Sequence, residues 1–66
     1  ARLSNADALI GRIGVVIADI PADASGYVKV DGDEWKAVSQ NGMAITSGNR
    51  VEIVSRESII VTVKLI

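Results

Sequence analysis

Apolar residues alternate with polar ones in short runs along this chain, and a period of two residues predicts strands rather than helices. Most of the apolar residues are Val, Ile and Ala, and the β-branched ones among them favour strands. Glycine, proline and asparagine separate the runs, as turns require. The predicted strands cover residues 13–20, 26–30, 33–39, 50–55 and 59–65.

The second and third predicted strands form a hairpin around Asp31-Gly32, a dipeptide typical of two-residue turns. A turn one residue later would set Lys29 against Lys36, which are like charges. Facing pairs contribute about 0.2–1 kcal/mol, with a sign that depends on the charges, so the turn at Asp31-Gly32 is favoured. The hairpin then pairs Val28 with Trp35 on one face, and Lys29 with Glu34 and Tyr27 with Lys36 on the other.

The remaining strands predict a small barrel. The strand at 13–20 is apolar on both faces, as expected where a barrel curls over itself or is covered by the polar lead-in at residues 1–11. In that lead-in, one helical turn near residues 6–10 would place Leu9 and Ile10 against the core. Residues 40–49 leave no room for a full helix. We therefore predict an all-β fold, a small five-stranded OB-like barrel over residues 12–66 with no full helix between strands three and four.

The last two strands must point their apolar faces the same way. In the strand at 50–55, Val51 and Ile53 are predicted to face inward. A three-residue loop at 56–58 would align them with the last strand, whereas a loop of even length would flip one set. That alignment places one alternate set inward, namely Ile59, Val61, Val63 and Leu65. The outer set includes Ile60, Thr62 and Ile66, which could contact a second copy of the chain.

Composition narrows the chemistry. The 66 residues contain no His and no Cys, which removes the usual general base, disulfides and zinc sites. Seven basic and eight acidic residues give a net charge of −1, without the basic surplus of nucleic-acid-binding domains. The carboxylates of Asp31, Asp33 and Glu34 are explained by the turn and do not predict a metal site. We predict no catalytic residues, no metal and no cofactor.

Three segments together resemble a known family. They are Leu9-Ile10-Gly11-Arg12-Ile13-Gly14, the hairpin from Gly26 through Trp35 to Ala37, and Ile45-Thr46-Ser47-Gly48-Asn49-Arg50-Val51. In this order and with these gaps they resemble the soluble C-terminal domain of NfeD proteins, over residues 8–66. Each segment alone is weak evidence, and the last recurs in many small barrels.

The resemblance implies an OB-type barrel tethered behind transmembrane helices, excised here from a longer membrane protein. It implies a parent chain in the cell membrane, with this domain soluble and on the cytoplasmic side. Its expected partners are membrane proteins of the stomatin, prohibitin and flotillin type. Longer members carry a serine protease domain, whose machinery is not found in these 66 residues. The resemblance therefore implies a non-catalytic protein-interaction module.

Five residues are candidates for contacts with a partner: Trp35, Tyr27, Lys29, Lys36 and Met43. Tryptophan is a common anchor at interfaces, but a cap on the core against Val28 is the favoured role for Trp35, and one ring could do both. Tyr27, Lys29 and Lys36 share the outer face of the hairpin, which could be a docking face or an ordinary solvated one. For Met43 the sequence leaves two roles open, a contact residue on the surface or a core residue.

Two other functions compete with the interaction module. A single-stranded nucleic-acid-binding OB domain would stack bases on Tyr27 and Trp35 in a basic groove. The predicted register points these two aromatics to opposite faces, and the net charge is negative, so this alternative is second. A biotinyl or lipoyl carrier presents a lysine at a hairpin tip, and neither residues 31–32 nor residues 56–58 contain one.

Overall fold

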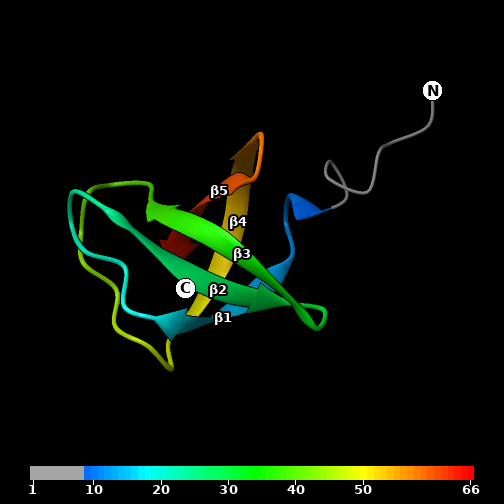
Figure 1. Ribbon diagram of the computed structural model, residues 1–66, viewed down its shortest axis with the longest axis horizontal. Coiled ribbons are helices and arrows are strands. Elements are labelled where there is room, and N and C mark those ends of the chain that lie inside the picture. The colour runs from blue at the N-terminus through cyan, green and yellow to red at the C-terminus, as the bar shows by residue number, and fades with distance from the viewer. Residues whose placement is uncertain (1–8) are drawn as a thin grey trace.

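In the computed structural model, which describes residues 9–66, five strands close into one barrel (Figure 1). They are β1 (Ile13–Ala18), β2 (Ser25–Val30), β3 (Asp33–Ser39), β4 (Arg50–Glu57) and β5 (Ile60–Leu65). Around the barrel the order is β1-β2-β3-β5-β4; β3 and β5 are parallel and the other pairs antiparallel. The predicted all-β, five-stranded barrel is confirmed. Most of the helical turn predicted at residues 6–10 lies outside the described residues.

The β2–β3 hairpin has the predicted register. Asp31 and Gly32 both have positive φ, 51° and 87°, which is the backbone of a two-residue turn matched to strand twist. Val28 lies opposite Trp35, Lys29 opposite Glu34 and Tyr27 opposite Lys36. In Figure 1 this turn lies at one end of the barrel, and the connections at residues 19–24 and 40–49 lie at the other.

The β4–β5 hairpin differs from the prediction. Strand β4 continues to Glu57, and the turn is the two residues Ser58 and Ile59 rather than a three-residue loop at 56–58. A two-residue turn alone would flip one inward set. The ladder compensates with a bulge between Ile53 and Ser55, because one extra residue restores the alternation. Val51, Ile53, Val61 and Val63 are all fully buried.

The core is aliphatic and fills the barrel. Its buried members are Leu9, Val16, Ile20, Val28, Val30, Ala37, Ile45, Val51, Ile53, Val61 and Val63, with Trp35 packed against them. Ile20 and Ile45 close the loop end through two backbone hydrogen bonds of 2.8 Å. Of the pair expected to plug the core, Leu9 is buried but Ile10 is exposed.

The predicted inward set of the last strand is only half correct. Val61 and Val63 are buried, but Ile59 and Leu65 are exposed. Ile59 belongs to the β4–β5 turn and Leu65 is the last residue of β5, so both lie past the region where strands surround the core. Alternation therefore predicts burial only within the closed part of the barrel.

Gly26 marks the closest approach of two chain segments. It is buried in β2, opposite Ala37 of β3. A Cβ atom at Gly26 would lie 2.5 Å from the carbonyl oxygen of Ala18 and closer still to that of Asp19. The chain leaving β1 can therefore cross over β2 only because residue 26 has no side chain.

Candidate functional site

Trp35 sits at the boundary between the core and the surface. It lies opposite Val28 in the hairpin and packs against the buried cluster, so it caps the core, which is one of the two roles considered for it. Its indole Nε1 is buried and has no acceptor among the described residues. A buried N–H that lacks an acceptor typically costs about 1–3 kcal/mol. The described residues thus partly bury the ring of Trp35 but provide no hydrogen-bond acceptor for its N–H.

A hollow of about 370 Å³ opens beside this ring. It is lined by Tyr27, Glu34, Trp35, Lys36 and Ile59. Three of the five are large and apolar or aromatic, and Tyr27 and Ile59 are 46% and 68% exposed. We call this the Trp35 hollow. Its lining combines apolar surface with the two opposite charges of Glu34 and Lys36, an arrangement suited to an apolar side chain from another molecule.

The hollow lies where the first residues of β3 have no neighbour in β5. Pairing between β3 and β5 starts at Lys36 opposite Ile60, so residues 33–35 of β3 have a neighbour on the β2 side only. The β4–β5 turn places Ile59 next to this free edge. Tyr27 and Trp35 point to opposite faces of the hairpin, as predicted, yet both line the hollow because it wraps around that edge.

The structure brings only some of the predicted contact residues together. Trp35, Tyr27 and Lys36 line one hollow. Lys29 is exposed on the outer face of β2 and does not line the hollow. Its pair with Glu34 is one residue pair nearer the Asp31-Gly32 turn than the pair of Val28 and Trp35. Met43 is 62% exposed on the β3–β4 connection and lines neither described hollow, so it is not a core residue.

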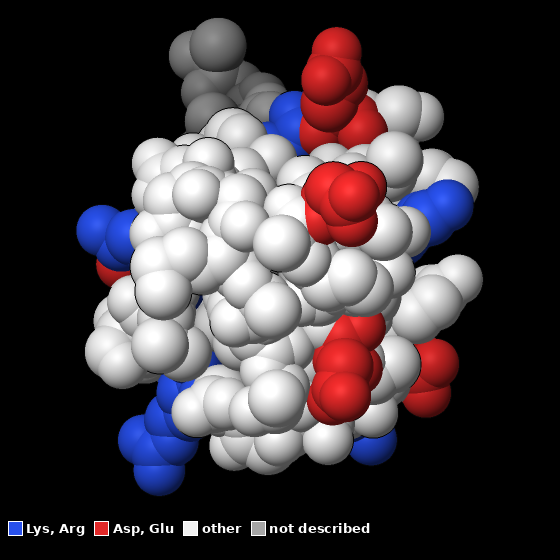
Figure 2. All heavy atoms as spheres, turned by 90° about the vertical axis from the view of Figure 1, so that its left-hand side faces the viewer, with Lys and Arg blue, Asp and Glu red and all other residues white. Residues whose placement is uncertain are grey.

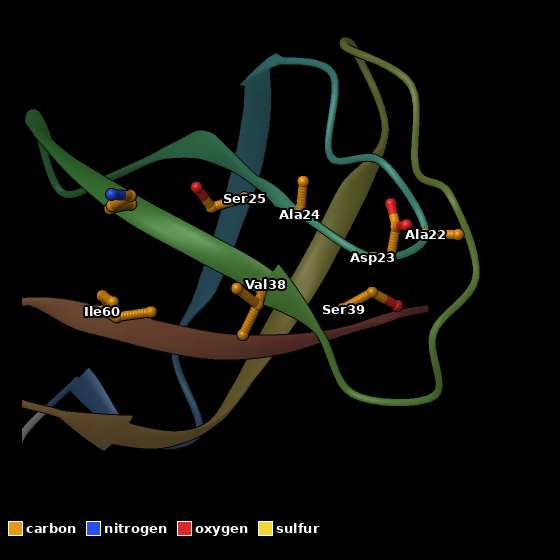
Figure 3. Close-up of a pocket in the computed structure, with 8 residues that line it drawn as sticks. Ala22, Asp23, Ala24, Ser25, Val38, Ser39 and Ile60 are labelled. Atoms are coloured by element: carbon orange, nitrogen blue, oxygen red, sulfur yellow. The ribbon is translucent and has the colours of Figure 1, made fainter.

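A second hollow of about 430 Å³ lies between the β1–β2 connection and strands β3 and β5 (Figure 3). It is lined by Ala22, Asp23, Ala24, Ser25, Lys36, Val38, Ser39 and Ile60. The Ser39 hydroxyl donates to Asn41 Oδ1 at 3.0 Å, and the chain has no histidine to activate it. This lining offers no nucleophile with an adjacent base.

Charged groups are sparse at the loop end of the barrel. Figure 2 views that end and shows uncharged side chains over most of it, with acidic groups gathered to one side. Within residues 9–66 the ion pairs are Arg12 with Asp31 at 2.9 Å and Lys64 with Glu52 at 3.7 Å. No group of three or more possible metal ligands occurs in this part of the chain. No helix in it is long and apolar enough to cross a membrane.

Sequence reasoning missed two features of the surface. Ile59 was expected to face inward from the last strand. It lies instead in the β4–β5 turn, because β4 is longer than predicted. Ile13, Val15 and Ile17 of β1 are exposed on the outer face, and most of the lead-in that was expected as one possible cover lies outside the described residues. The available signal was the strand itself, which is apolar at nearly every position, so one of its apolar faces had to point outward.

Comparisons with known proteins agree on one family. The model of the NfeD-like C-terminal, partner-binding domain matches residues 6–64. No match is found among curated proteins. Among solved structures, the C-terminal domain of stomatin operon partner protein 1510-C from Pyrococcus horikoshii is 28% identical, with 97% of each chain covered and a TM-score of 0.86.

Two other solved domains are similar to this chain. The soluble domain of the NfeD protein YuaF from Bacillus subtilis is 32% identical over 89% of this chain and 75% of that one, with a TM-score of 0.83. The soluble domain of a Corynebacterium glutamicum membrane protein implicated in regulation of membrane protease activity is 30% identical, covers 85% and 89%, and has a TM-score of 0.77. The resemblance seen in the sequence is thus confirmed, and the chain belongs to the NfeD family as its C-terminal, partner-binding domain.

Proposed function

We propose that this domain is a non-catalytic interaction module that engages a membrane protein of the stomatin, prohibitin or flotillin type. The single observation that carries the proposal is the match to the partner-binding domain over residues 6–64. The 1510-C domain, which superposes with a TM-score of 0.86, is named as a stomatin operon partner, which supports the stomatin class. Solved relatives are soluble domains of membrane proteins, which supports a parent chain in the cell membrane. The proposal also places this domain on the cytoplasmic side of that membrane.

The Trp35 hollow is the proposed anchor site for that partner. Tryptophan and tyrosine dominate the energetics of many interfaces, especially when they line a pocket. Here an apolar partner side chain would bury the exposed surfaces of Tyr27 and Ile59. An acceptor from the partner would satisfy the indole N–H of Trp35 after a small movement of the ring. The free edge of β3 at residues 33–35 offers backbone groups to an extended segment.

Binding to a purified partner tests the proposal. The stomatin-type protein of the same organism, purified in detergent, is titrated against the immobilised domain. We expect saturable binding that weakens at least tenfold in Ile59→Glu, because a carboxylate would replace an apolar side chain in the lining of the hollow. Leu65→Glu is the matched control, since it places the same carboxylate on an exposed aliphatic residue that lines neither hollow. If wild type binds and Ile59→Glu binds equally well, the hollow is excluded as the anchor site. If wild type does not bind, the proposed partner class is refuted.

The single-stranded nucleic-acid alternative is not favoured by the family assignment. It has its own test, because Trp35 is the only tryptophan in the chain. Titration with a single-stranded oligonucleotide should leave Trp35 fluorescence unchanged. Tight quenching that weakens steeply with salt would revive this alternative.

A further inference from the structure

The outer face of β1 carries three successive aliphatic side chains. Ile13, Val15 and Ile17 are 48%, 41% and 41% exposed. The outer face of an antiparallel sheet normally carries polar side chains, so a row of three aliphatics is unusual. β1 is paired with β2 on one side and β4 on the other, so a partner could reach this face only through side chains. We call these three residues the β1 stripe.

Two cations border the stripe. The register places Val15 directly opposite Lys29 of β2 and directly opposite Arg50 of β4. Directly opposite side chains in antiparallel strands have Cβ atoms about 4.5–5.5 Å apart. Within residues 9–66 no carboxylate lies within 4.0 Å of the Lys29 or Arg50 charge, whereas the Arg12 guanidinium is paired with Asp31. An aliphatic row therefore lies between two cations that form no ion pair within residues 9–66, although Glu34 of β3 lies directly opposite Lys29.

The stripe is continuous with the Trp35 hollow. A bulge between Val16 and Ala18 makes Ile17 the extra residue of β1 and sets Ala18 opposite Tyr27. Tyr27 also lines the hollow. One exposed apolar surface thus runs from the β1 stripe across Tyr27 to the hollow, and a single partner could cover both.

We propose that the β1 stripe is a second contact surface for the same partner, and that it takes an amphipathic segment whose aliphatic side chains are flanked by carboxylates. The inference rests on the proposed function and adds the face and the partner's chemistry. Aliphatic side chains would be buried on Ile13, Val15 and Ile17, and carboxylates would pair with Lys29 and Arg50. The apolar row and the two cations together define the segment.

Two other occupants fit the charges less well. A flat anionic lipid surface would also meet Glu52, which lies directly opposite Ile13, whereas a folded partner can avoid that carboxylate. A second copy related by a two-fold axis at Val15 would bring Lys29 and Arg50 of each copy together, and like charges oppose such a contact. The charges therefore favour a partner protein.

Binding of the purified stomatin-type protein to immobilised variants tests the proposal. We expect Val15→Thr combined with Ile17→Thr to weaken binding at least tenfold, since both changes keep β-branched residues in the strand. Arg50→Glu should weaken it five- to tenfold, with a loss that shrinks in high salt. Lys64→Glu is the matched control, because it makes the same charge change on β5, on the far side of Glu52 from the stripe. Its binding affinity should stay within twofold of wild type. Unfolding midpoints check that each variant folds, and Arg50→Glu keeps the test open if the threonine variant does not.

Each other outcome overturns the inference in a recognisable way. If wild type binds, Ile59→Glu weakens binding and the stripe variants do not, the inference fails and the proposed function stands. If wild type does not bind, both fail. Binding of wild type alone to vesicles of phosphatidylglycerol and phosphatidylcholine, lost in the stripe variants, would assign the stripe to lipid. A doubled mass in solution that the stripe variants abolish would assign it to a second copy.

Discussion

Replacing Gly26 by alanine should destabilise the barrel, although strand propensity predicts the reverse. Glycine inside a strand is about 0.5–1 kcal/mol worse than alanine at an open site, because it loses more backbone entropy on folding. At Gly26 the added Cβ would lie 2.5 Å from the carbonyl oxygen of Ala18 and closer to that of Asp19. Both atoms belong to the main chain, so no side-chain rotation can relieve the overlap.

The size of the stability loss follows from the backbone shift that the added methyl group requires. Added methyl groups in packed sites cost about 1–3 kcal/mol, and a clash with backbone belongs at the upper end. After the entropy gain, a net loss of about 2–3 kcal/mol is expected for Gly26→Ala. A 66-residue domain has a total stability of roughly 3–10 kcal/mol. The expected fall in Tm is about 10–20 °C.

Urea and thermal unfolding, followed by Trp35 fluorescence and far-ultraviolet circular dichroism, measure this loss. Gly48 is the matched control, because its φ is +94° and a Cβ there meets nothing within 4 Å. At Gly48 asparagine should be better tolerated than alanine, since asparagine accepts positive φ. At Gly26 asparagine should be worse than alanine, since it is larger. A Gly26→Ala domain as stable as wild type, or asparagine better than alanine at Gly26, would refute the steric explanation.

Three further changes probe the core, a turn and an ion pair, each by urea unfolding. Ile53→Ala should cost about 2–5 kcal/mol because Ile53 is fully buried, whereas Ile59→Ala should stay within about 0.5 kcal/mol; equal losses would contradict the assigned burial. Ser58→Gly should raise stability by about 0.5 kcal/mol, because Ser58 has a φ of 58°, and a lower midpoint would count against a strained turn. A double-mutant cycle of Arg12→Ala and Asp31→Asn should give a coupling under about 1 kcal/mol that vanishes in 1 M NaCl, since both side chains are more than half exposed; a coupling that persists in salt would argue against a surface pair.

Part of the candidate site could be read from the sequence. Trp35 and Tyr27 stand out because they are the only aromatic residues, and the Asp31-Gly32 turn places them on opposite faces of the hairpin. Their meeting in one hollow could not be predicted. It depends on β5 starting only at Ile60, which leaves part of β3 without a neighbour. That start is a consequence of where β4 ends, at Glu57, and both positions lie far from Trp35 in the sequence.

The local structure of this domain is encoded by neighbouring residues in the chain. Alternating β-branched residues specify strands, and Asp31-Gly32 with its cross-strand charges specifies the hairpin register, because these effects act between residues close in the chain. The bulge in β4, the outward aliphatic row on β1 and the close approach at Gly26 arise instead from the packing of the whole barrel. Each depends on barrel closure, which sets distant segments side by side and allows β1 to bury only one of its two apolar faces.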